Sequence, residues 1–266
     1  MTRTTNTVRK SFPMGALWVG LVFTFLYLPI LVFFIFSFND ASFPSPWAGF
    51  TLKWYRQLFT ENSAWIAIYH SLFVSFSAVI LSLCLGTLLI FFVTQSERVE
   101  RLLVQFYANL VFPEIVLAVG LLSLFVFLGV GLGSGTLIIA HTVLGLGYAV
   151  PLVFGRYHEL DYRLVEAARD LGASPWQTFC TVILPLIKST IYAAGILVFI
   201  ISFDDFIFAY FCSGGEFQTF PLYVLSMLRT GVSPVVNAIS TILLLFSSLL
   251  ILIYSSFKTK HSSGIW

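Results

Sequence analysis

Three carboxylates lie in long apolar stretches of the sequence that contain no Lys or Arg. Asp204 and Asp205 are neighbours in the apolar run 189–212, and Glu114 interrupts the run 102–130. Each ionised acid near the centre of a membrane helix costs about 2.5–3.5 kcal/mol, and such groups pair with a base or line a water-filled path. We therefore expect these acids to meet a cation from outside the chain or to be protonated. Hydrogen bonds to another subunit, or hydration near the outer interface, are the structural alternatives.

The elements around these acids suggest what they could bind. In an uninterrupted helix, neighbouring residues point about 100° apart. Asp205 would then share a face with small side chains, and Asp204 would share one with large apolar side chains. Aromatic neighbours such as Phe206 and Tyr210 suit an organic cation through cation–π and apolar contacts. His141, in another apolar run, is expected to form an interhelical hydrogen bond rather than to relay protons.

The composition is that of a membrane protein. Of the 266 residues, 58% are hydrophobic and 10% are charged, and the net charge is +2. A soluble chain carries about 25% charged residues, so a soluble enzyme is excluded. The small net charge gives no electrostatic basis for binding nucleic acid. The three cysteines lie far apart, which indicates neither a disulfide framework nor a metal site.

Six apolar runs are long enough to cross a membrane as helices, which need about 20 residues. They predict an all-α integral membrane protein, with spans at 15–38, 65–94, 102–130, 136–154, 189–212 and 235–257. The expected organisation is a cytoplasmic N-terminus (1–14), a first transmembrane helix (15–38), an extracytoplasmic loop (39–64), a five-helix permease core (65–257) and a cytoplasmic C-terminus (258–266).

The distribution of basic residues predicts the orientation. When loops are assigned alternately to the two sides, eleven of the 14 Lys and Arg residues fall on one side and three on the other. The positive-inside rule places the richer side, which holds both termini and the loop 156–188, in the cytoplasm. The first run is longer than a signal-peptide core and has no small-residue cleavage site after it, so we expect a retained anchor.

The cytoplasmic loop 156–188, between the fourth and fifth spans, reads as two short helices. Good helix formers at 163–171 precede Gly172, which suits the left-handed position that closes a helix. Ser174 then opens a second helix, and Gln177 stands at the spacing of a capping box. An ordinary solvated helical hairpin is the alternative interpretation of these signals.

The residues of this loop resemble the E-A-A loop of ABC importer membrane subunits. In that family a short helix docks on the ATPase subunit and transmits its motion. The resemblance implies a type I (MetI-like) importer fold and a coupling role for the matching residues. Independently of the resemblance, Pro185 is expected to end the second helix, because proline has no N–H to donate within a helix. The residues assigned to ATPase coupling are Glu166, Ala167, Ala168, Gly172, Leu184 and Pro185.

Catalytic signals are missing from the sequence. It contains no G-x-x-x-x-G-K-[ST] segment to cradle phosphates and no Ser/His/Asp, Cys/His or H-E-x-x-H arrangement. We therefore expect a non-catalytic chain with no cofactor or metal of its own. ATP and Mg would be used by a separate ATPase subunit.

The resemblance narrows to the membrane subunits of spermidine/putrescine importers, of the PotC type. Glu114 departs from that type, which usually has Asp there. The resemblance implies a bacterial inner-membrane importer built from this chain, a sister permease, two ATP-binding subunits and an extracytoplasmic polyamine-binding protein, surrounded by lipid. The similar segments are 27–30, 37–39, 49–51, 53–55, 70–72, 204–205, 231–234, 237–238 and 241–243.

Two other functions stay open. One is an ABC permease for a different small cationic solute. The other is an ion-coupled secondary transporter that uses the acids for protons or sodium, although such proteins commonly show two matching halves with broken helices. Asp204, Asp205 and Glu114 are the substrate-path candidates in the favoured interpretation. The sequence does not indicate whether spermidine or putrescine would be preferred.

Overall fold

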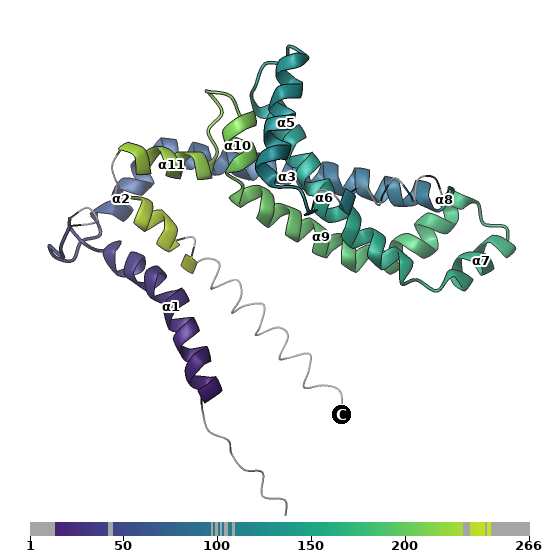
Figure 1. Ribbon diagram of the computed structural model, residues 1–266, viewed down its shortest axis with the longest axis horizontal. Helices are drawn as coiled ribbons and strands as arrows, with labels where there is room; N and C mark the ends of the chain where they lie inside the picture. The colour runs from purple at the N-terminus through teal and green to yellow at the C-terminus, as the bar shows by residue number, and fades with distance from the viewer. Residues whose placement is uncertain are drawn as a thin grey trace, which may run out of the picture. The chain divides into compact units, whose positions relative to one another are not determined.

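The computed structural model describes residues 14–41, 45–96, 98, 101, 103, 106–107, 110–230, 235–242 and 244–245. Helices account for most of the described chain (Figure 1). It divides into two compact units, Asn62–Ser226 and the pair of segments Met1–Glu61 and Met227–Trp266. The two units are described separately below.

Three long helices form the core of the Asn62–Ser226 unit. They are α3 (Asn62–Val93), α6 (Ser134–His158) and α9 (Leu184–Asp204), and each packs against the other two (Figure 1). Small residues allow this close approach, as expected for membrane helices. At Gly145 an added Cβ would lie 2.4 Å from Ser82 Oγ of α3. Glycine at this position lets the helices meet almost backbone to backbone.

Two short helices pack together beside this core. They are α5 (Glu114–Phe127) and α10 (Ile207–Cys212), and their buried side chains join those of α6 in one apolar cluster. Phe208 and Cys212 of α10 are completely buried in that cluster. A loop follows α10 and leads to α11 (Phe220–Thr230), whose first N–H donates to Ser71 Oγ at 2.8 Å.

The six-span prediction is supported in part. Four described helical stretches are long and apolar enough to cross a membrane, and two shorter apolar helices accompany them. The sixth predicted span, 235–257, lies largely outside the described residues, so the count of six stays a prediction. The long stretches are 17–36, 62–93, 134–158 and 175–204, and the shorter ones are 114–127 and 220–229.

The third apolar run differs from its prediction as a continuous helix. Residues 111–113 are not helical, and α5 begins at Glu114 with Pro113 as its N-cap residue. Proline lacks an N–H and disfavours helical geometry in the residue before it. Pro113 therefore lies immediately before a helix, and Glu114 occupies the first helical position.

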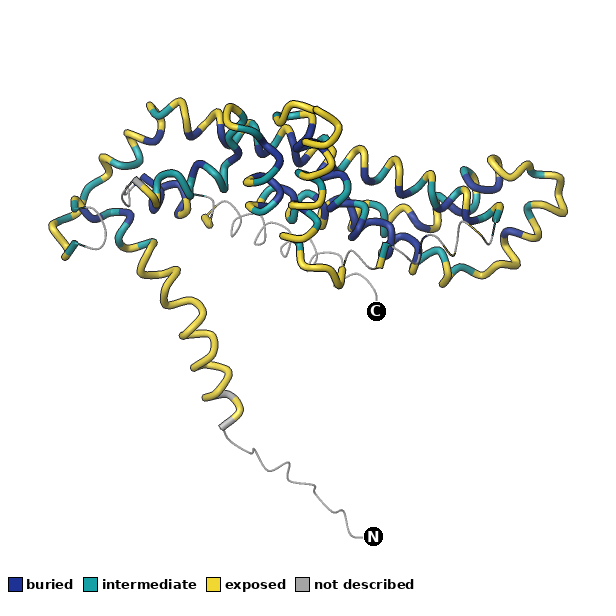
Figure 2. The backbone as a smooth tube through the Cα atoms, turned by 45° about the horizontal axis from the view of Figure 1, so that its top comes forward, coloured by how far each residue is buried: buried dark blue, intermediate teal, exposed yellow. Residues whose placement is uncertain are grey.

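The other unit contains α1 (Met14–Phe36) and α2 (Lys53–Thr60), joined by a hairpin. Figure 2 shows α1 exposed along its length, as expected for a helix that meets lipid or another subunit. An isolated antiparallel bridge pairs Asn39 with Phe50 in the hairpin.

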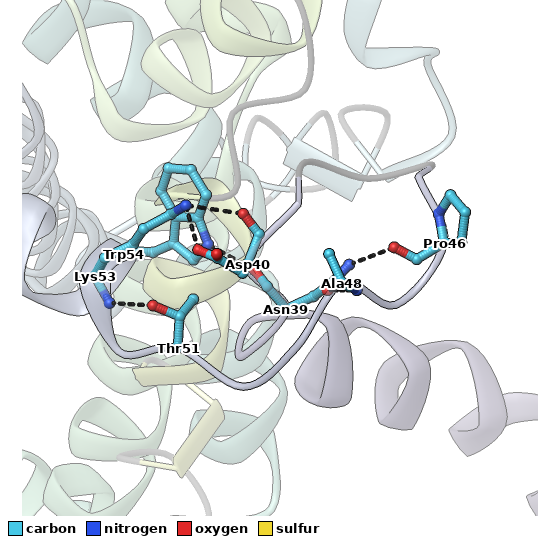
Figure 3. A network of polar contacts seen from close by, with 7 residues as sticks. All are labelled: Asn39, Asp40, Pro46, Ala48, Thr51, Lys53 and Trp54. Carbon is cyan, nitrogen blue, oxygen red and sulfur yellow. Dashed lines mark hydrogen bonds and ion pairs between the residues drawn. The ribbon is translucent and has the colours of Figure 1, made fainter.

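Asn39 organises the hairpin through its side chain and backbone (Figure 3). It is completely buried, accepts from the Ala48 N–H at 2.7 Å and, through its backbone carbonyl, from Trp54 Nε1 at 2.8 Å. Lys53 pairs with the Asp40 carboxylate. The hairpin residues that carry the family resemblance therefore include several that hold the hairpin together.

Candidate functional site

The fifth predicted span is not one continuous helix. Helix α9 ends at Asp204, Asp205 is extended with φ −67° and ψ 127°, and α10 begins at Ile207. The prediction that Asp204 and Asp205 lie on two faces of a single helix is therefore wrong. The two carboxylates instead occupy a break between two helices.

The Asp205 side chain stabilises this break from within. Its Oδ2 accepts a hydrogen bond from the Ala209 N–H at 3.0 Å, in the first turn of α10. Side chains that cap such unpaired N–H groups are typically worth about 1 kcal/mol. Asp205 is only 8% exposed. Part of its hydrogen-bonding capacity is therefore used to begin α10.

His141 on α6 is the second partner of Asp205. Its Nδ1 lies 2.6 Å from Ser202 Oγ, which confirms the predicted interhelical hydrogen bond. Its Nε2 lies 3.4 Å from Asp205 Oδ2, although the geometry gives Nε2 no hydrogen bond to any described residue. His141 is 1% exposed. The chain thus contains a basic neighbour for Asp205, which sequence reasoning missed.

The other two acids are more accessible. Asp204 is exposed at the end of α9. Glu114 is partly exposed, and Tyr148 Oη of α6 donates to its Oε1 over a long 3.5 Å. The three carboxylates therefore divide into one buried acid with partners in the chain and two acids that can reach a ligand.

The predicted loop helices are present at the other end of α9. Helix α7 (Tyr162–Asp170) follows its N-cap residue Asp161, whose side chain accepts from the Arg163 N–H. Gly172 has φ +83°, as predicted. Its N–H donates to Arg169 and the next N–H donates to Ala168, which together make a Schellman motif.

The predicted capping box is also confirmed. Ser174 Oγ accepts from the Gln177 N–H, and Gln177 Oε1 accepts from the Ser174 N–H at 2.8 Å. The helix that follows, α8, comprises Pro175–Thr178.

The expectation that Pro185 ends the second loop helix is wrong. A π-helical turn, Phe179–Ile183, joins α8 directly to α9, and Pro185 lies in the first turn of α9. The N–H of Leu184 reaches back five residues to the Phe179 carbonyl. Wider π hydrogen bonding accommodates a proline that has no N–H to donate. The helix therefore continues past the proline.

The loop presents a mixed apolar and charged surface. Glu166 and Ala167 are exposed on α7, whereas Val165 is 3% exposed and packs into the core that α3, α6 and α9 share. Leu171 is 90% exposed and Trp176 is 57% exposed. Large exposed apolar side chains of this kind are typical of a protein interface.

Known proteins are similar in sequence to this chain over most of its length. Residues 94–264 match the family described as binding-protein-dependent transport system inner membrane component. The spermidine/putrescine transport system permease protein PotC of Escherichia coli K12 is 34% identical over 248 residues, covering 91% of this chain and 94% of that protein. The putrescine transport system permease protein PotI of the same organism is 34% identical over 246 residues, covering 89% of this chain and 87% of that protein.

Solved structures support the fold. A chain of a bacterial ABC transporter involved in the import of alginate matches with a TM-score of 0.69 at 14% identity, covering 92% of this chain and 94% of that one. A chain of an amino acid ABC transporter matches with a TM-score of 0.56 at 18% identity, covering 76% of this chain and 98% of that one. With an importer-permease fold and a family match across the E-A-A loop, this chain belongs to the binding-protein-dependent transport system inner membrane components, the non-catalytic membrane subunits of ABC transporters.

Proposed function

We propose that this chain is a permease subunit that carries polyamines such as spermidine or putrescine across the bacterial inner membrane. The observation that carries the proposal is the 34% identity to polyamine permeases over 91% of the chain. The positions of the acids support a cationic solute. Asp204 is exposed where α9 ends, and Glu114 is accessible where α5 begins.

The surroundings of Asp204 suit an organic diamine or triamine. Phe206 and Tyr210 are 37% and 48% exposed, and their ring centroids lie 5.5 Å apart. Aromatic faces attract ammonium groups and cover the methylenes between them. Lys188, the basic residue of α9, is 16 residues from Asp204, or about 24 Å along the helix axis. Asp204 therefore has no competing cation from its own helix.

The cytoplasmic end of α9 would receive the driving force. In this proposal Glu166, Ala167, Ala168 and Gly172 form the surface that meets an ATP-binding subunit. Leu184 and Pro185 are the first two residues of α9, and the π-helical turn connects them to that surface. Two ATP-binding subunits would hydrolyse ATP with Mg, a sister permease would complete the path, and a binding protein would deliver the polyamine. Both termini would be cytoplasmic.

Uptake of labelled putrescine and spermidine by the complex reconstituted in vesicles tests the substrate assignment. Asp204→Asn should reduce uptake about ten- to hundredfold, the range expected when one charge-assisted hydrogen bond is lost. Affinity of the separate binding protein should be unchanged. Glu216→Gln is the matched control, because it neutralises another exposed acid in the loop after α10.

Wild-type uptake by Asp204→Asn, Glu114→Gln and the double variant would contradict the carboxylate path. Uptake driven by an ion gradient without an ATP-binding subunit would instead support the secondary-transporter alternative. Labelling of a cysteine at Ser174 from the outside, rather than from the cytoplasmic side, would contradict the proposed orientation.

A further inference from the structure

Helix α6 contacts both short helices that begin near the acids. His141 and Tyr148 are seven residues apart, so they lie on the same face of α6, two turns or about 10.5 Å apart along the axis. His141 faces Asp205 and Tyr148 faces Glu114. One helix face therefore contacts an acid at each of the two helix starts.

Helix α6 also holds the far end of α10. Thr136, 3% exposed, donates from Oγ1 to the Cys212 carbonyl at 2.8 Å. The last carbonyls of a helix lack partners within the helix, so this contact satisfies one of them. Asp205, beside His141, satisfies an N–H at the start of α10. A side chain of α6 thus bonds the last residue of α10, and another side chain of α6 lies next to the acid that caps its first turn.

An ionised Asp205 favours the His141 tautomer that carries its hydrogen on Nε2, 3.4 Å from the carboxylate. A carboxylate only accepts hydrogen bonds, so a bare Nε2 lone pair facing it would be repulsive. Ser202 permits this tautomer, because its hydroxyl can donate to Nδ1 and leave the hydrogen on Nε2. Ser202 therefore orients the imidazole, and the imidazole orients Asp205.

We propose that His141 and Tyr148 are positioning residues of the transport path. His141 holds Asp205, and through it the break that leaves Asp204 exposed, while Tyr148 holds Glu114 at the start of α5. This inference rests on the proposed function for the role of Asp204 and Glu114. The contacts themselves can be tested without transport.

The first test measures the helix break directly. Spin labels replace Ile196 on α9 and Tyr210 on α10, both exposed, in a background in which Cys84, Cys180 and Cys212 are alanine. Double electron–electron resonance then gives the distance between the two spin labels in the assembled complex. An unbroken helix would separate these positions by about 21 Å along its axis.

We expect His141→Leu to shift or broaden this distance. His141→Gln, which keeps a donor for the carboxylate, should shift the distance less than His141→Leu does. If the His141→Leu complex does not assemble, Ser202→Ala takes its place and should give a smaller shift. A second label pair at Leu152 and Tyr192 reports the packing of α6 on α9 and should not change. An unchanged 196–210 distance in the His141 and Ser202 variants would overturn the role of His141.

The second test uses uptake by the complex. Loss of His141 should reduce uptake by no more than Asp204→Asn does, and the effect should disappear in an Asp204→Asn background. An equal fold-loss in both backgrounds would show a general structural role and overturn positioning. If Asp204→Asn transports normally while the label distance still shifts, the contact stands and the path assignment fails.

Tyr148→Phe tests the other contact. The hydrogen bond is long, so we expect a loss of uptake of only about two- to fivefold. The loss should vanish in a Glu114→Gln background. Tyr107→Phe is a matched control, because its hydroxyl donates over the same 3.5 Å to the Pro151 carbonyl of α6. A loss that persists without Glu114, or no loss at all, would overturn the role of Tyr148.

Discussion

The loop that contains α7 and α8 and the break at Asp205 lie at opposite ends of α9 and are stabilised in different ways. The loop is closed by contacts between residues two to five positions apart, such as the reciprocal bonds of Ser174 and Gln177. The break adds a buried pair, His141 and Asp205, that joins two helices far apart in the sequence. Local capping can therefore shape a surface loop, whereas a buried interruption in a membrane helix depends on its neighbours.

Removing the buried carboxylate should have the largest effect. Asp205→Ala leaves the Ala209 N–H without its acceptor and His141 without its acidic neighbour. A buried donor left without its acceptor costs about 1–3 kcal/mol of unfolding free energy, and the cavity left by the removed side chain adds to that cost. Thermal unfolding of the purified complex should show this loss, and Asp205→Asn, which keeps an acceptor oxygen, should lose less. Equal losses would mean that the charge, rather than the cap, matters.

Crowding the junction of the long helices should have the next largest effect. An added Cβ at Gly145 would lie 2.4 Å from Ser82 Oγ and 2.8 Å from Val198 Cγ1. Overpacking of this kind costs about 1–3 kcal/mol, so Gly145→Ala should lower the unfolding temperature. Gly155→Ala on the same helix is the control, because nothing lies within 4 Å of its added Cβ. Equal stability of the two variants would contradict the close packing.

A smaller and more local effect is expected in the loop. Gly172→Val forces a β-branched residue to φ +83°, which costs about 1–2 kcal/mol. Hydrogen exchange should quicken in the last turn of α7 and leave the amides of α10 unchanged. Stimulation of ATP hydrolysis by the loaded binding protein should also fall. Normal stimulation would count against docking of this loop on the ATPase.

The smallest effect is expected at the capping box. Ser174→Ala removes an acceptor for the Gln177 N–H and should cost about 1 kcal/mol. Exchange of the Gln177 amide should quicken by roughly the corresponding factor of five. Ser174→Asp keeps an acceptor and should restore protection. A change in the distance across the Asp205 break would show that the two regions are not independent.

The same contrast explains what the sequence could predict. Gly172, Ser174 and Gln177 signal their structure within a few residues, so the loop was predictable apart from the π-helical turn. The break was not, because the residues around Asp205 include neither Pro nor Gly and the partner His141 is 64 positions away. Pro113 did carry a signal, because proline disfavours helical geometry in the residue before it, but the run is apolar on both sides and therefore predicted one continuous span.

The π-helical turn gives α9 a mechanical property. Because α8, the π-helical turn and α9 are continuous, residues Pro175–Asp204 form one helical rod of 30 residues, about 45 Å long. Its backbone hydrogen bonds resist stretching, so an axial push applied at Pro175 would displace Asp204 without a relay of side chains. The two ends of this rod carry the loop surface and an exposed carboxylate.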